Sequence, residues 1–369
     1  MNVTSNKRLL ALDVMRGITI AGMILVNNPG SWTYAYTPLT HAQWNGLTPT
    51  DLVFPFFMFI MGISTYISLR KYNFTFSTPA ALKIIKRTIV IFLIGIAINW
   101  FALLCYTHDP LPFAHIRILG VMQRLALCYG ASALIALLIK HKYIPYLIVA
   151  LLVGYFIILV TGNGFAYNET NILSIVDRSI LGDAHMYQDN HIDPEGLLST
   201  IPSIAHVLIG FCVGKLLMEV KDIREKLERL FLIGTILTFA GFLLSYGCPL
   251  NKKIWSPTFV LVTCGLGSSL LALLVWIIDI KGYKRWSHFF ESFGVNPLFI
   301  YVLADVLAIL LSVITYQGES ASLQQAFYAS TLQPVFGNEG GSLAYAILFV
   351  LLNWAIGYIL YKKKIYIKI

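Results

Sequence analysis

The sequence predicts an all-α, polytopic membrane protein with about ten transmembrane helices. Of its 369 residues, 57% are hydrophobic and only 12% are charged, and the mean hydropathy is +0.72. An ordinary soluble domain is about 45–50% apolar and about 25% charged, so most of this chain is expected to face lipid. The apolar stretches run unbroken for about twenty residues, whereas a membrane β-barrel requires segments of about ten residues with alternating polarity.

The membrane-spanning segments are predicted from windows of about twenty mainly apolar residues, the length that crosses the hydrocarbon core as a helix. The first window contains the charged residues Asp13 and Arg16 and lacks a small-residue cleavage pattern after it. We therefore expect it to be retained as a first helix rather than removed as a signal peptide. In chain order the windows are 9–27, 52–69, 88–105, 118–139, 143–161, 197–217, 229–247, 257–279, 294–315 and 342–361.

The loops between these windows alternate in charge, which tests the number and order of the spans. If the ten windows are numbered in chain order, the N-terminal tail and the segments that follow windows 2, 4, 6, 8 and 10, together with the last residues of window 6 and the first residue of window 7, hold 21 of the 27 Lys and Arg residues. Cytoplasmic loops carry the excess of Lys and Arg, so we expect both termini to be cytoplasmic. The basic residues of the opposite side are Arg117, Arg178, Lys252 and Lys253. The long loops expected on that side are 28–51, 106–117, 162–196, 248–256 and 316–341.

The remaining composition excludes several other classes of protein. The formal net charge of +9 does not indicate nucleic-acid binding, because the basic residues lie between apolar segments instead of on one globular element. The five cysteines have no metal-ligand spacing and predict no disulfide framework, and no His, Asp and Glu cluster predicts a metal site. Without an internal repeat or a soluble segment of useful size, residues 1–369 are expected to form one transmembrane domain in contact with membrane lipid.

Several polar side chains fall inside the predicted spans, where an unpaired polar group is costly. Asp13 and Arg16 lie three residues apart on one helical face, which fits an internal ion pair and a direct role in function equally well. Single Asn and His side chains in such positions more often join neighbouring helices than bind a ligand. Together with this pair, a polar cavity at the centre of the bundle is predicted by Asn99, Gln123, Arg124, His206 and Asp305.

The loop after the first window carries the residue types that acyl transfer requires. His41 can exchange a proton near neutral pH. Asn27 and Asn45 offer neutral amide donors, and Asp51 opens the second window. A general base, an orienting carboxylate and donors for a developing oxyanion are the parts of such a site. Spacing alone does not distinguish this interpretation from a surface histidine packed beside Trp44.

At this loop the sequence also resembles a known family. The segments THAQWNGLT at 40–48 and DLVFP at 51–55 are similar to the catalytic region of heparan-α-glucosaminide N-acetyltransferase and its bacterial relatives. Further similar blocks follow in the same order over nearly the whole chain. They are RILGVMQRL at 117–125, DPEG at 193–196, NKKIW at 251–255 and GVNP at 294–297. The extra N-terminal luminal domain of the lysosomal enzyme has no counterpart, so the chain is expected to be the transmembrane catalytic unit alone.

The resemblance implies transfer of an acetyl group from cytosolic acetyl-CoA to the amine of a terminal glucosamine across the membrane. It implies that His41 is the active histidine and that Asn27 is the asparagine at the end of the first helix. We expect His41 to act as general base or as acetyl carrier, and the sequence does not choose between these routes. Asn27 or Asn45 would donate to the thioester oxygen, and Asp51 and Asp13 would orient or polarise.

Other residues are assigned to the two substrates. An anionic CoA moiety needs cationic or amide partners, and the candidates are Gln123, Arg124, Lys252 and Lys253. Lys252 and Lys253 have the alternative of merely capping a loop. The candidates for binding a cationic, hydroxyl-rich sugar acceptor are Trp44, Asp193, Glu195 and Asp305.

Two other functions fit the same features. A sugar transporter for N-acetylglucosamine would also be a ten-helix bundle with a polar interior, although repeated halves are common in carriers. An enzyme that O-acylates envelope polysaccharide would use a hydroxyl acceptor in place of an amine. In each case the expected location is the inner (plasma) membrane as a multi-pass protein, and the resemblance is compatible with a homodimer.

Overall fold

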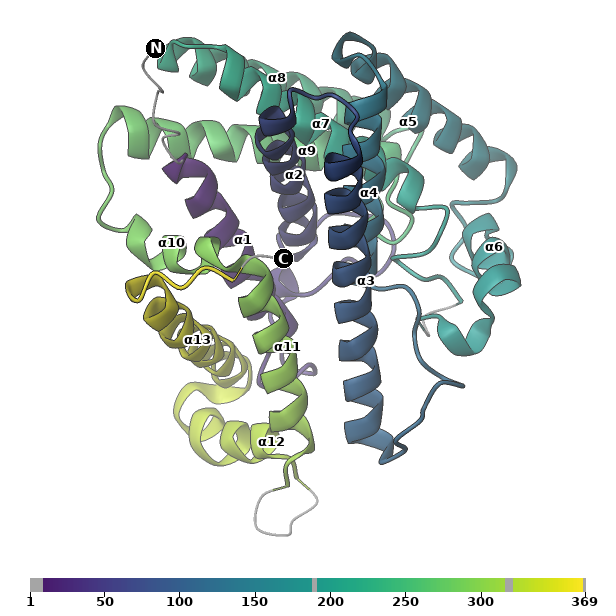
Figure 1. The fold of residues 1–369 in the computed structure, drawn as a ribbon. Coiled ribbons are helices and arrows are strands. Elements are labelled where there is room, and N and C mark those ends of the chain that lie inside the picture. The colour runs from purple at the N-terminus through teal and green to yellow at the C-terminus, as the bar shows by residue number, and fades with distance from the viewer. Residues whose placement is uncertain (1–8, 188–190, 316–320, 368–369) are drawn as a thin grey trace.

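The computed structural model describes residues 9–187, 191–315 and 321–367, which form a bundle of helices (Figure 1). Within these residues there is no β-strand, and one isolated β-bridge joins Thr315 and Ser322. Nine of the described helices are long and apolar enough to cross a membrane. The number is ten if α10 (Ser287–Val295) and α11 (Pro297–Val313), which are bent by 86°, form one broken span. The predicted all-α, multi-pass membrane fold is confirmed.

Five helices make up the inner part of the bundle, with 61% to 67% of each spanning window buried. They are α1 (Leu10–Asn27), α2 (Thr50–Leu69), α4 (Val121–Leu138), α7 (Thr200–Glu219) and α9 (Pro257–Val275). Glycines bring α2 and α7 together, because a Cβ added at Gly62 would lie 2.1 Å from the carbonyl oxygen of Val207. Small residues at such contacts allow close backbone packing inside a membrane.

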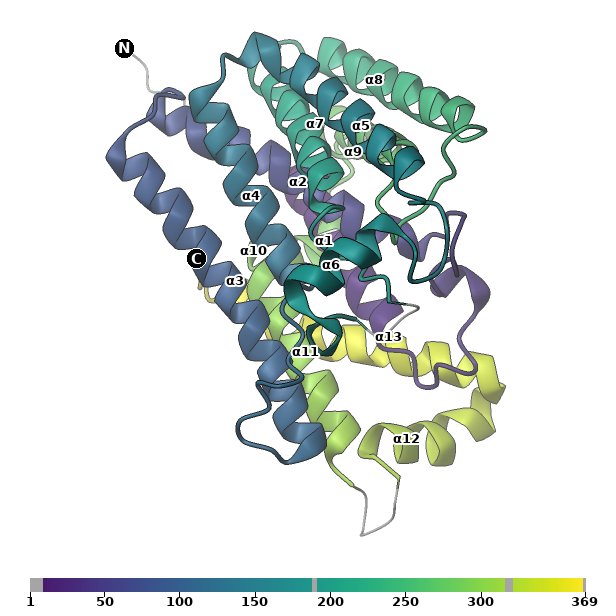
Figure 2. The ribbon, with the colours of Figure 1, turned by 90° about the vertical axis from the view of Figure 1, so that its right-hand side faces the viewer.

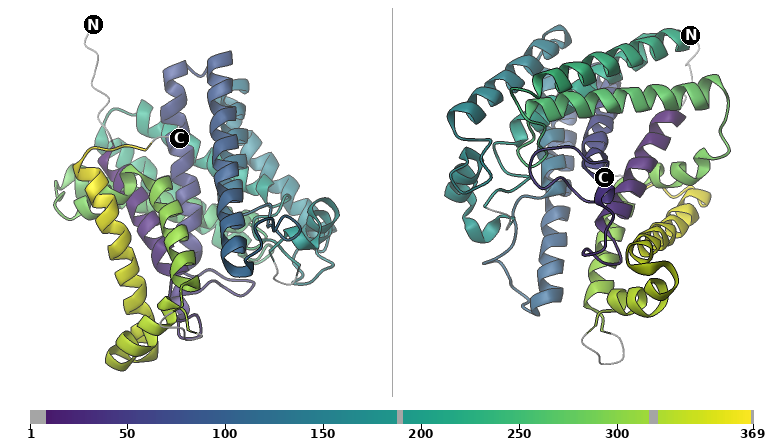
Figure 3. Two further views of the ribbon diagram at one scale, coloured as in Figure 1. Left: turned by 60° about the horizontal axis from the view of Figure 1, so that its bottom comes forward. Right: turned by 180° about the vertical axis from the view of Figure 1, so that it is seen from behind.

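Four longer or more exposed helices surround this inner group, with only 11% to 33% of each spanning window buried. They are α3 (Thr78–Thr107), α5 (Ile144–Thr161), α8 (Ile223–Leu244) and α13 (Gln333–Lys362). Helix α3 runs beside α4 (Figure 2), and α8 runs beside α9, as the view from behind shows (Figure 3). The exposed apolar side chains of these outer helices are those expected to contact lipid.

The structure differs from the predicted windows mainly at helix ends. Helix α3 begins at Thr78 instead of residue 88, with Pro79 in its first turn, where a missing N–H is tolerated. The window 294–315 breaks at Asn296, whose side chain instead bonds the C-terminal segment at Ile365 and Ile367, each at 2.8 Å. The last helix starts earlier than predicted and follows α12 (Leu323–Phe327) and the π-helix η6 (Tyr328–Leu332).

The long loops expected on the non-cytoplasmic side gather at one end of the bundle. The Trp44 indole donates to the Phe165 carbonyl oxygen at 3.0 Å, and the Gly46 N–H donates to the Leu250 carbonyl oxygen at 2.8 Å. The loop between α3 and α4 bonds the segment after α6 (Ile172–Leu181), a short helix that the hydropathy windows did not predict. Four loops that are far apart in the sequence therefore build a single surface.

Candidate active site

The loop between α1 and α2 is shaped by the carboxylate of Asp51, whose side chain is fully buried. Its Oδ2 accepts hydrogen bonds from the N–H groups of Ala42 at 3.1 Å and Thr48 at 3.0 Å, and from the Thr48 hydroxyl at 3.0 Å. The turn between them has Gly46 at φ +129°, a conformation that favours glycine. The other oxygen, Oδ1, lies 2.7 Å from Nδ1 of His41. Residues 41–51 thus form a local unit that presents one imidazole.

The contact with Asp51 determines which ring nitrogen of His41 is available. A carboxylate can only accept, so Nδ1 carries a hydrogen and donates it to Asp51. In the neutral imidazole Nε2 then holds the lone pair. The His41 side chain is 45% exposed, whereas that of Asp51 is 0% exposed. An oriented base whose partner carboxylate is buried is the arrangement that acyl-transfer enzymes use.

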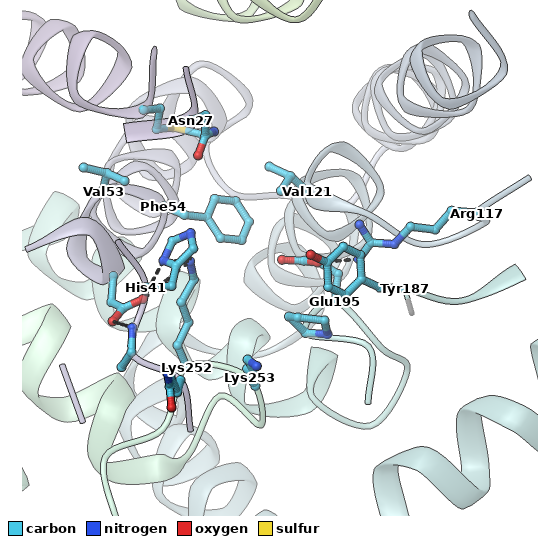
Figure 4. A pocket seen from close by; sticks show the side chains of 15 residues that line it. Asn27, His41, Val53, Phe54, Arg117, Val121, Tyr187, Glu195, Lys252 and Lys253 are labelled. Atoms are coloured by element: carbon cyan, nitrogen blue, oxygen red, sulfur yellow. Dashed lines mark hydrogen bonds and ion pairs between the residues drawn. The ribbon is translucent and has the colours of Figure 1, made fainter. Parts of the chain in front are cut away.

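His41 and Asp51 line a cavity of about 310 Å³ (Figure 4). Asn27, at the end of α1, and Phe54, in α2, lie on the His41 side of the cavity. The opposite side is formed by Arg117, Tyr187 and Glu195. The remaining lining residues are Met23, Ala42, Gln43, Val53, Val121, Pro194, Lys252 and Lys253.

The turn between α8 and α9 brings two lysines to this cavity. Asn251 is fully buried, accepts from the N–H of Ile254 at 3.1 Å, and donates its own N–H to the Ser256 hydroxyl at 3.1 Å. Ser256 also caps α9. The Asn251 amide donates to Asn45 at 3.2 Å, so the side chain of Asn45 joins two loops and does not line the cavity.

The two lysines point to different partners. The Nζ of Lys252 lies 3.0 Å from Nδ1 and 3.2 Å from Nε2 of His41, and 3.7 Å from Oδ1 of Asp51. The Nζ of Lys253 donates to the Tyr167 hydroxyl at 2.7 Å and lies 4.6 Å from the centre of that ring. Lys252 is therefore part of the His41 group, and Lys253 belongs to the rim of the cavity.

The wall opposite His41 is an ion-pair network centred on Arg117. Its guanidinium donates to Asp193 at 3.1 and 2.6 Å and to Glu195 at 2.6 Å. Asp193 is fully buried and also accepts from the Tyr187 N–H at 2.8 Å, so it supports the wall from behind. Burial raises the pKa of Glu195, but the guanidiniums of Arg117 and Arg124 lower it by more, and the net shift is downward. Glu195 therefore presents a negative charge at the cavity.

Arg124 and Gln123, both predicted to bind CoA, lie in α4 outside the cavity lining. Arg124 donates to Ser203 at 2.8 Å and to the carbonyl oxygens of Pro194 at 3.1 Å and Gly196 at 3.0 Å. It thereby holds the backbone on both sides of Glu195. The side chain of Gln123 is buried against α3. Their contact with CoA stays a prediction. In the structure the contacts of both side chains are with other parts of the protein and hold the helices and the Glu195 segment together.

Three other predicted site residues also lie outside the cavity lining. Asp13 pairs with Arg16 at 2.8 Å, and at 1.5 Å per helical residue it lies roughly 21 Å along α1 from the end that reaches the cavity. Trp44 stacks on Tyr167 with ring centres 4.5 Å apart. Asp305 lies on α11, one helical turn after Tyr301. Their predicted catalytic or binding roles remain predictions.

A second cavity, of about 260 Å³, lies further along α1 and α2 and contains two arginines. Arg16 donates to Ser64 at 2.9 Å, and the guanidinium of Arg87 lies 4.7 Å from the centre of the Tyr129 ring. The linings of the two cavities approach within one helical turn. Phe54 and Val121 line the first cavity, and Phe57 and Leu125, three and four residues later on α2 and α4, line the second.

Comparison with known proteins agrees with this architecture. A family model described as heparan-alpha-glucosaminide N-acetyltransferase, catalytic, matches residues 8–246. The chain belongs to this family. The mouse heparan-alpha-glucosaminide N-acetyltransferase is 28% identical over 99% of this chain and 61% of its own length. The human protein of that name is 30% identical over 98% of this chain and 60% of its own length. The resemblance noted in the sequence is confirmed.

The family match covers the loop before α2, the loop before α4 and the segment before α7, but it ends before the turn between α8 and α9. Residues 8–246 include His41, Asp51, Arg117 and Glu195 and end before the turn that carries Lys252. The alignments with the mouse and human proteins cover nearly all of this chain, although the chain spans only about 60% of the length of these relatives.

Sequence reasoning assigned no role to two residues of the cavity wall, Arg117 and Tyr187. Arg117 could have been noticed as one of the few basic residues in the non-cytoplasmic loops and as the first residue of a similar block. Tyr187 carries no comparable signal. Among the described residues, no group of three His, Cys, Asp or Glu side chains is arranged to hold a metal ion.

Proposed function

We propose that this protein transfers the acetyl group of acetyl-CoA to the amine of a glucosamine-type sugar, and that His41 is the reacting base. The observation that carries this proposal is the 2.7 Å contact between the buried Asp51 carboxylate and Nδ1 of His41, because that contact leaves the lone pair of the neutral ring on Nε2. Removal of a general base typically costs about 10²–10⁴ in rate.

In the direct route, His41 takes the proton that the amine must lose. The amine nitrogen attacks the thioester carbonyl carbon, the C–S bond breaks, and the proton held on Nε2 passes to the leaving thiolate, which gives free CoA thiol. Asn27 lines the same cavity and is the amide proposed to donate to the carbonyl oxygen as it gains charge.

In the covalent route, Nε2 itself attacks the thioester carbon and the C–S bond breaks. The leaving thiolate takes up the proton that Nδ1 of the acetylated ring releases, which gives the CoA thiol and a neutral acetyl-imidazole. The acetyl-imidazole is then attacked by the amine, which restores His41 and yields the same amide. Labelled acetyl-CoA supplied without sugar distinguishes the routes. Label retained on His41 supports the covalent route, and its absence from an enzyme that turns over supports the direct one.

The two arginines of the second cavity support the proposal that the acetyl donor is anionic, as CoA is. Arg16 and Arg87 are cationic groups suited to phosphate. Arg16 lies eleven residues before Asn27, which is roughly 16 Å along α1 at 1.5 Å per residue. We propose that the phosphates of CoA bind on this side and that the thioester reaches His41 between α2 and α4.

The wall of Arg117, Tyr187 and Glu195 supports an amino sugar as acceptor. The Glu195 carboxylate is charged and can pair with the ammonium form of the acceptor before its proton is lost. The Tyr187 ring offers an apolar face beside these polar groups. We also propose that the protein lies in the inner (plasma) membrane with both termini cytoplasmic, so that this wall faces outward.

The test uses purified protein in detergent, where no compartments exist. With acetyl-CoA and glucosamine, release of CoA thiol and formation of N-acetylglucosamine are expected, and both are lost in His41→Gln. A transporter would release no thiol under these conditions. N-acetylglucosamine has no free amine, so thiol release with that sugar as acceptor would instead indicate an O-acylating enzyme.

A further inference from the structure

Lys252 lies against His41, but neither the direct nor the covalent route of acetyl transfer uses its ammonium group. Its Nζ is almost equally distant from both ring nitrogens, at 3.0 and 3.2 Å. An atom in the ring plane at equal distances from both nitrogens would overlap the carbon between them. The ammonium therefore lies over the face of the ring and acts as a nearby positive charge more than as a hydrogen-bond donor to either lone pair.

We propose that Lys252 is a catalytic residue that keeps His41 uncharged, so that the lone pair of Nε2 is available near neutral pH. This inference rests on the proposed role of His41 as base or acetyl carrier, because both routes need the neutral ring. Lys252 contacts Nε2, the reacting nitrogen, which separates it from residues that only position the loop.

The other two cations of the cavity are directed elsewhere. Arg117 is engaged by the carboxylates of Asp193 and Glu195 on the opposite wall. Lys253 donates to the Tyr167 hydroxyl. Of the cations that line this cavity in the described part of the chain, Lys252 is the one whose charge is placed against the imidazole.

The charged groups that face His41 come from four parts of the chain. Asp51 projects from α2, Lys252 and Lys253 from the turn before α9, Arg117 from the loop before α4, and Glu195 from the segment before α7. Arg117 is shared between Glu195 and Asp193, each at 2.6 Å, so this network keeps one net negative charge on the wall opposite His41. Asn27, from α1, is uncharged.

The protonation of His41 is therefore set by two opposed neighbours. Asp51 is in contact with Nδ1 and favours the imidazolium, while Lys252 is at a similar distance and disfavours it. Burial lowers the pKa of Lys252, whereas the carboxylates of Asp51 and Glu195 raise it, and the net shift is downward. If Lys252 were removed, the contact with Asp51 would favour the imidazolium without opposition, and Nε2 of the imidazolium has no lone pair.

The experiment measures the protonation of His41 without relying on turnover. Diethyl pyrocarbonate modifies neutral imidazole, so the rate of its reaction at His41, followed by peptide mass spectrometry against pH, gives the midpoint of the titration. Lys252→Met is compared with wild type and with Lys252→Arg, which keeps the charge. Lys252→Gln provides a second neutral variant if Lys252→Met does not fold. His288, outside the site and 62% exposed, is followed in the same samples as an internal control.

The expected result is a midpoint for His41 that is raised by about 1–3 pH units in both neutral variants. Lys252→Arg should stay close to wild type, and His288 should be unchanged in every variant. Equal His41 midpoints in all proteins would overturn the proposal. So would an equal shift in Lys252→Arg, because the cause would then be altered packing instead of charge.

Turnover separates this inference from the proposed function. If the wild type makes N-acetylglucosamine, the acid limb of its kcat/KM profile should move upward with the His41 midpoint in Lys252→Met. Titration of the acceptor amine is common to all variants and cancels in this comparison. A uniform loss of activity at every pH without a shift would overturn the inference. A wild type without transferase activity but with shifted midpoints would instead contradict the proposed function alone.

Discussion

Two histidine–aspartate pairs in the loops differ in how the carboxylate is held. His41 lies 2.7 Å from Asp51, and His191 lies 3.3 Å from Asp183. Both imidazoles are 45% exposed, but the Asp51 side chain is 0% exposed and that of Asp183 is 59% exposed. An exposed pair is weakened by solvent and by the mobility of both side chains. Burial of the carboxylate therefore distinguishes the oriented imidazole of His41 from the exposed pair of His191.

The same contrast appears between two arginine pairs. Arg117 lies 2.6 Å from Glu195, whose side chain is 9% exposed, and Arg178 lies 3.6 Å from Glu169, which is 63% exposed. The two arginines are almost equally exposed, at 25% and 28%. Again it is the burial of the carboxylate, and not that of the arginine, that distinguishes the pair in the cavity wall from the pair on the surface.

The largest expected effect is the loss of activity in His41→Gln compared with His191→Gln. Removal of the oriented base should lower acetyl transfer by about 10²–10⁴-fold, whereas the exposed pair should tolerate the change. The measurement is thiol release from acetyl-CoA by the purified variants at equal concentration. Equal activity of the two variants would show that burial of the partner carboxylate does not select the catalytic histidine.

The next largest loss of activity is expected for Asp51→Asn, with Asp183→Asn as its matched control. Three hydrogen-bond donors from Ala42 and Thr48 surround Oδ2, so the amide oxygen should occupy that position and the amide nitrogen should face His41. The amide would donate to Nδ1 and move the ring proton to Nε2, which removes the lone pair from the cavity. We expect a loss of up to about 10²–10⁴-fold in kcat, the range for loss of a general base, with an unchanged elution profile. A variant with wild-type kcat would contradict the assigned tautomer.

The arginine pairs make a prediction about stability. Arg117→Met leaves Asp193 and Glu195 buried without their cation, which should destabilise the fold by about 3–5 kcal/mol. Arg178→Met should cost about 1 kcal/mol or less. Thermal unfolding in detergent, followed by the loss of the monodisperse peak, gives the comparison. Equal losses of thermal stability in the two variants would mean that the Arg117 network contributes no more than a surface pair.

These pairs also show which features could be predicted from sequence. The spans followed from hydropathy because lipid requires about twenty apolar residues per helix. His41 and Asp51 were predicted together because ten residues of one loop bring them into contact. The Arg117 network joins residues 78 positions apart, and Lys252 reaches His41 across 211 positions. Those contacts depend on how helices and loops pack, which hydropathy does not determine. For the same reason the sequence does not reveal that Asn45, predicted as an oxyanion donor, accepts a hydrogen bond from Asn251, and its donor role stays a prediction.

Another buried carboxylate, that of Asp177, gives the smallest predicted effect and extends the comparison to pH. Asp177, on α6, accepts from the Leu197 N–H at 2.8 Å, and its Oδ2 has no hydrogen-bond partner among the described residues. Asp51, by contrast, has donors on both oxygens. Burial is the main reason that the pKa of Asp177 rises from 3.8 to about 6.

The direction of the pH effect follows from this shift. The folded protein holds the Asp177 proton more tightly than the unfolded chain, so its contribution to stability is complete below about pH 3.8 and is lost as pH rises through about 6. The shift corresponds to a change on the order of 3 kcal/mol. Asp177→Asn keeps an acceptor for Leu197 and has no charge to bury. It should therefore match wild type near pH 4 and exceed it in thermal stability near pH 7, whereas Asp183→Asn should change neither value. If the fall in stability persisted in Asp177→Asn, a group other than Asp177 would have to titrate in this range, and the burial of Asp177 would not be the cause of the pH dependence.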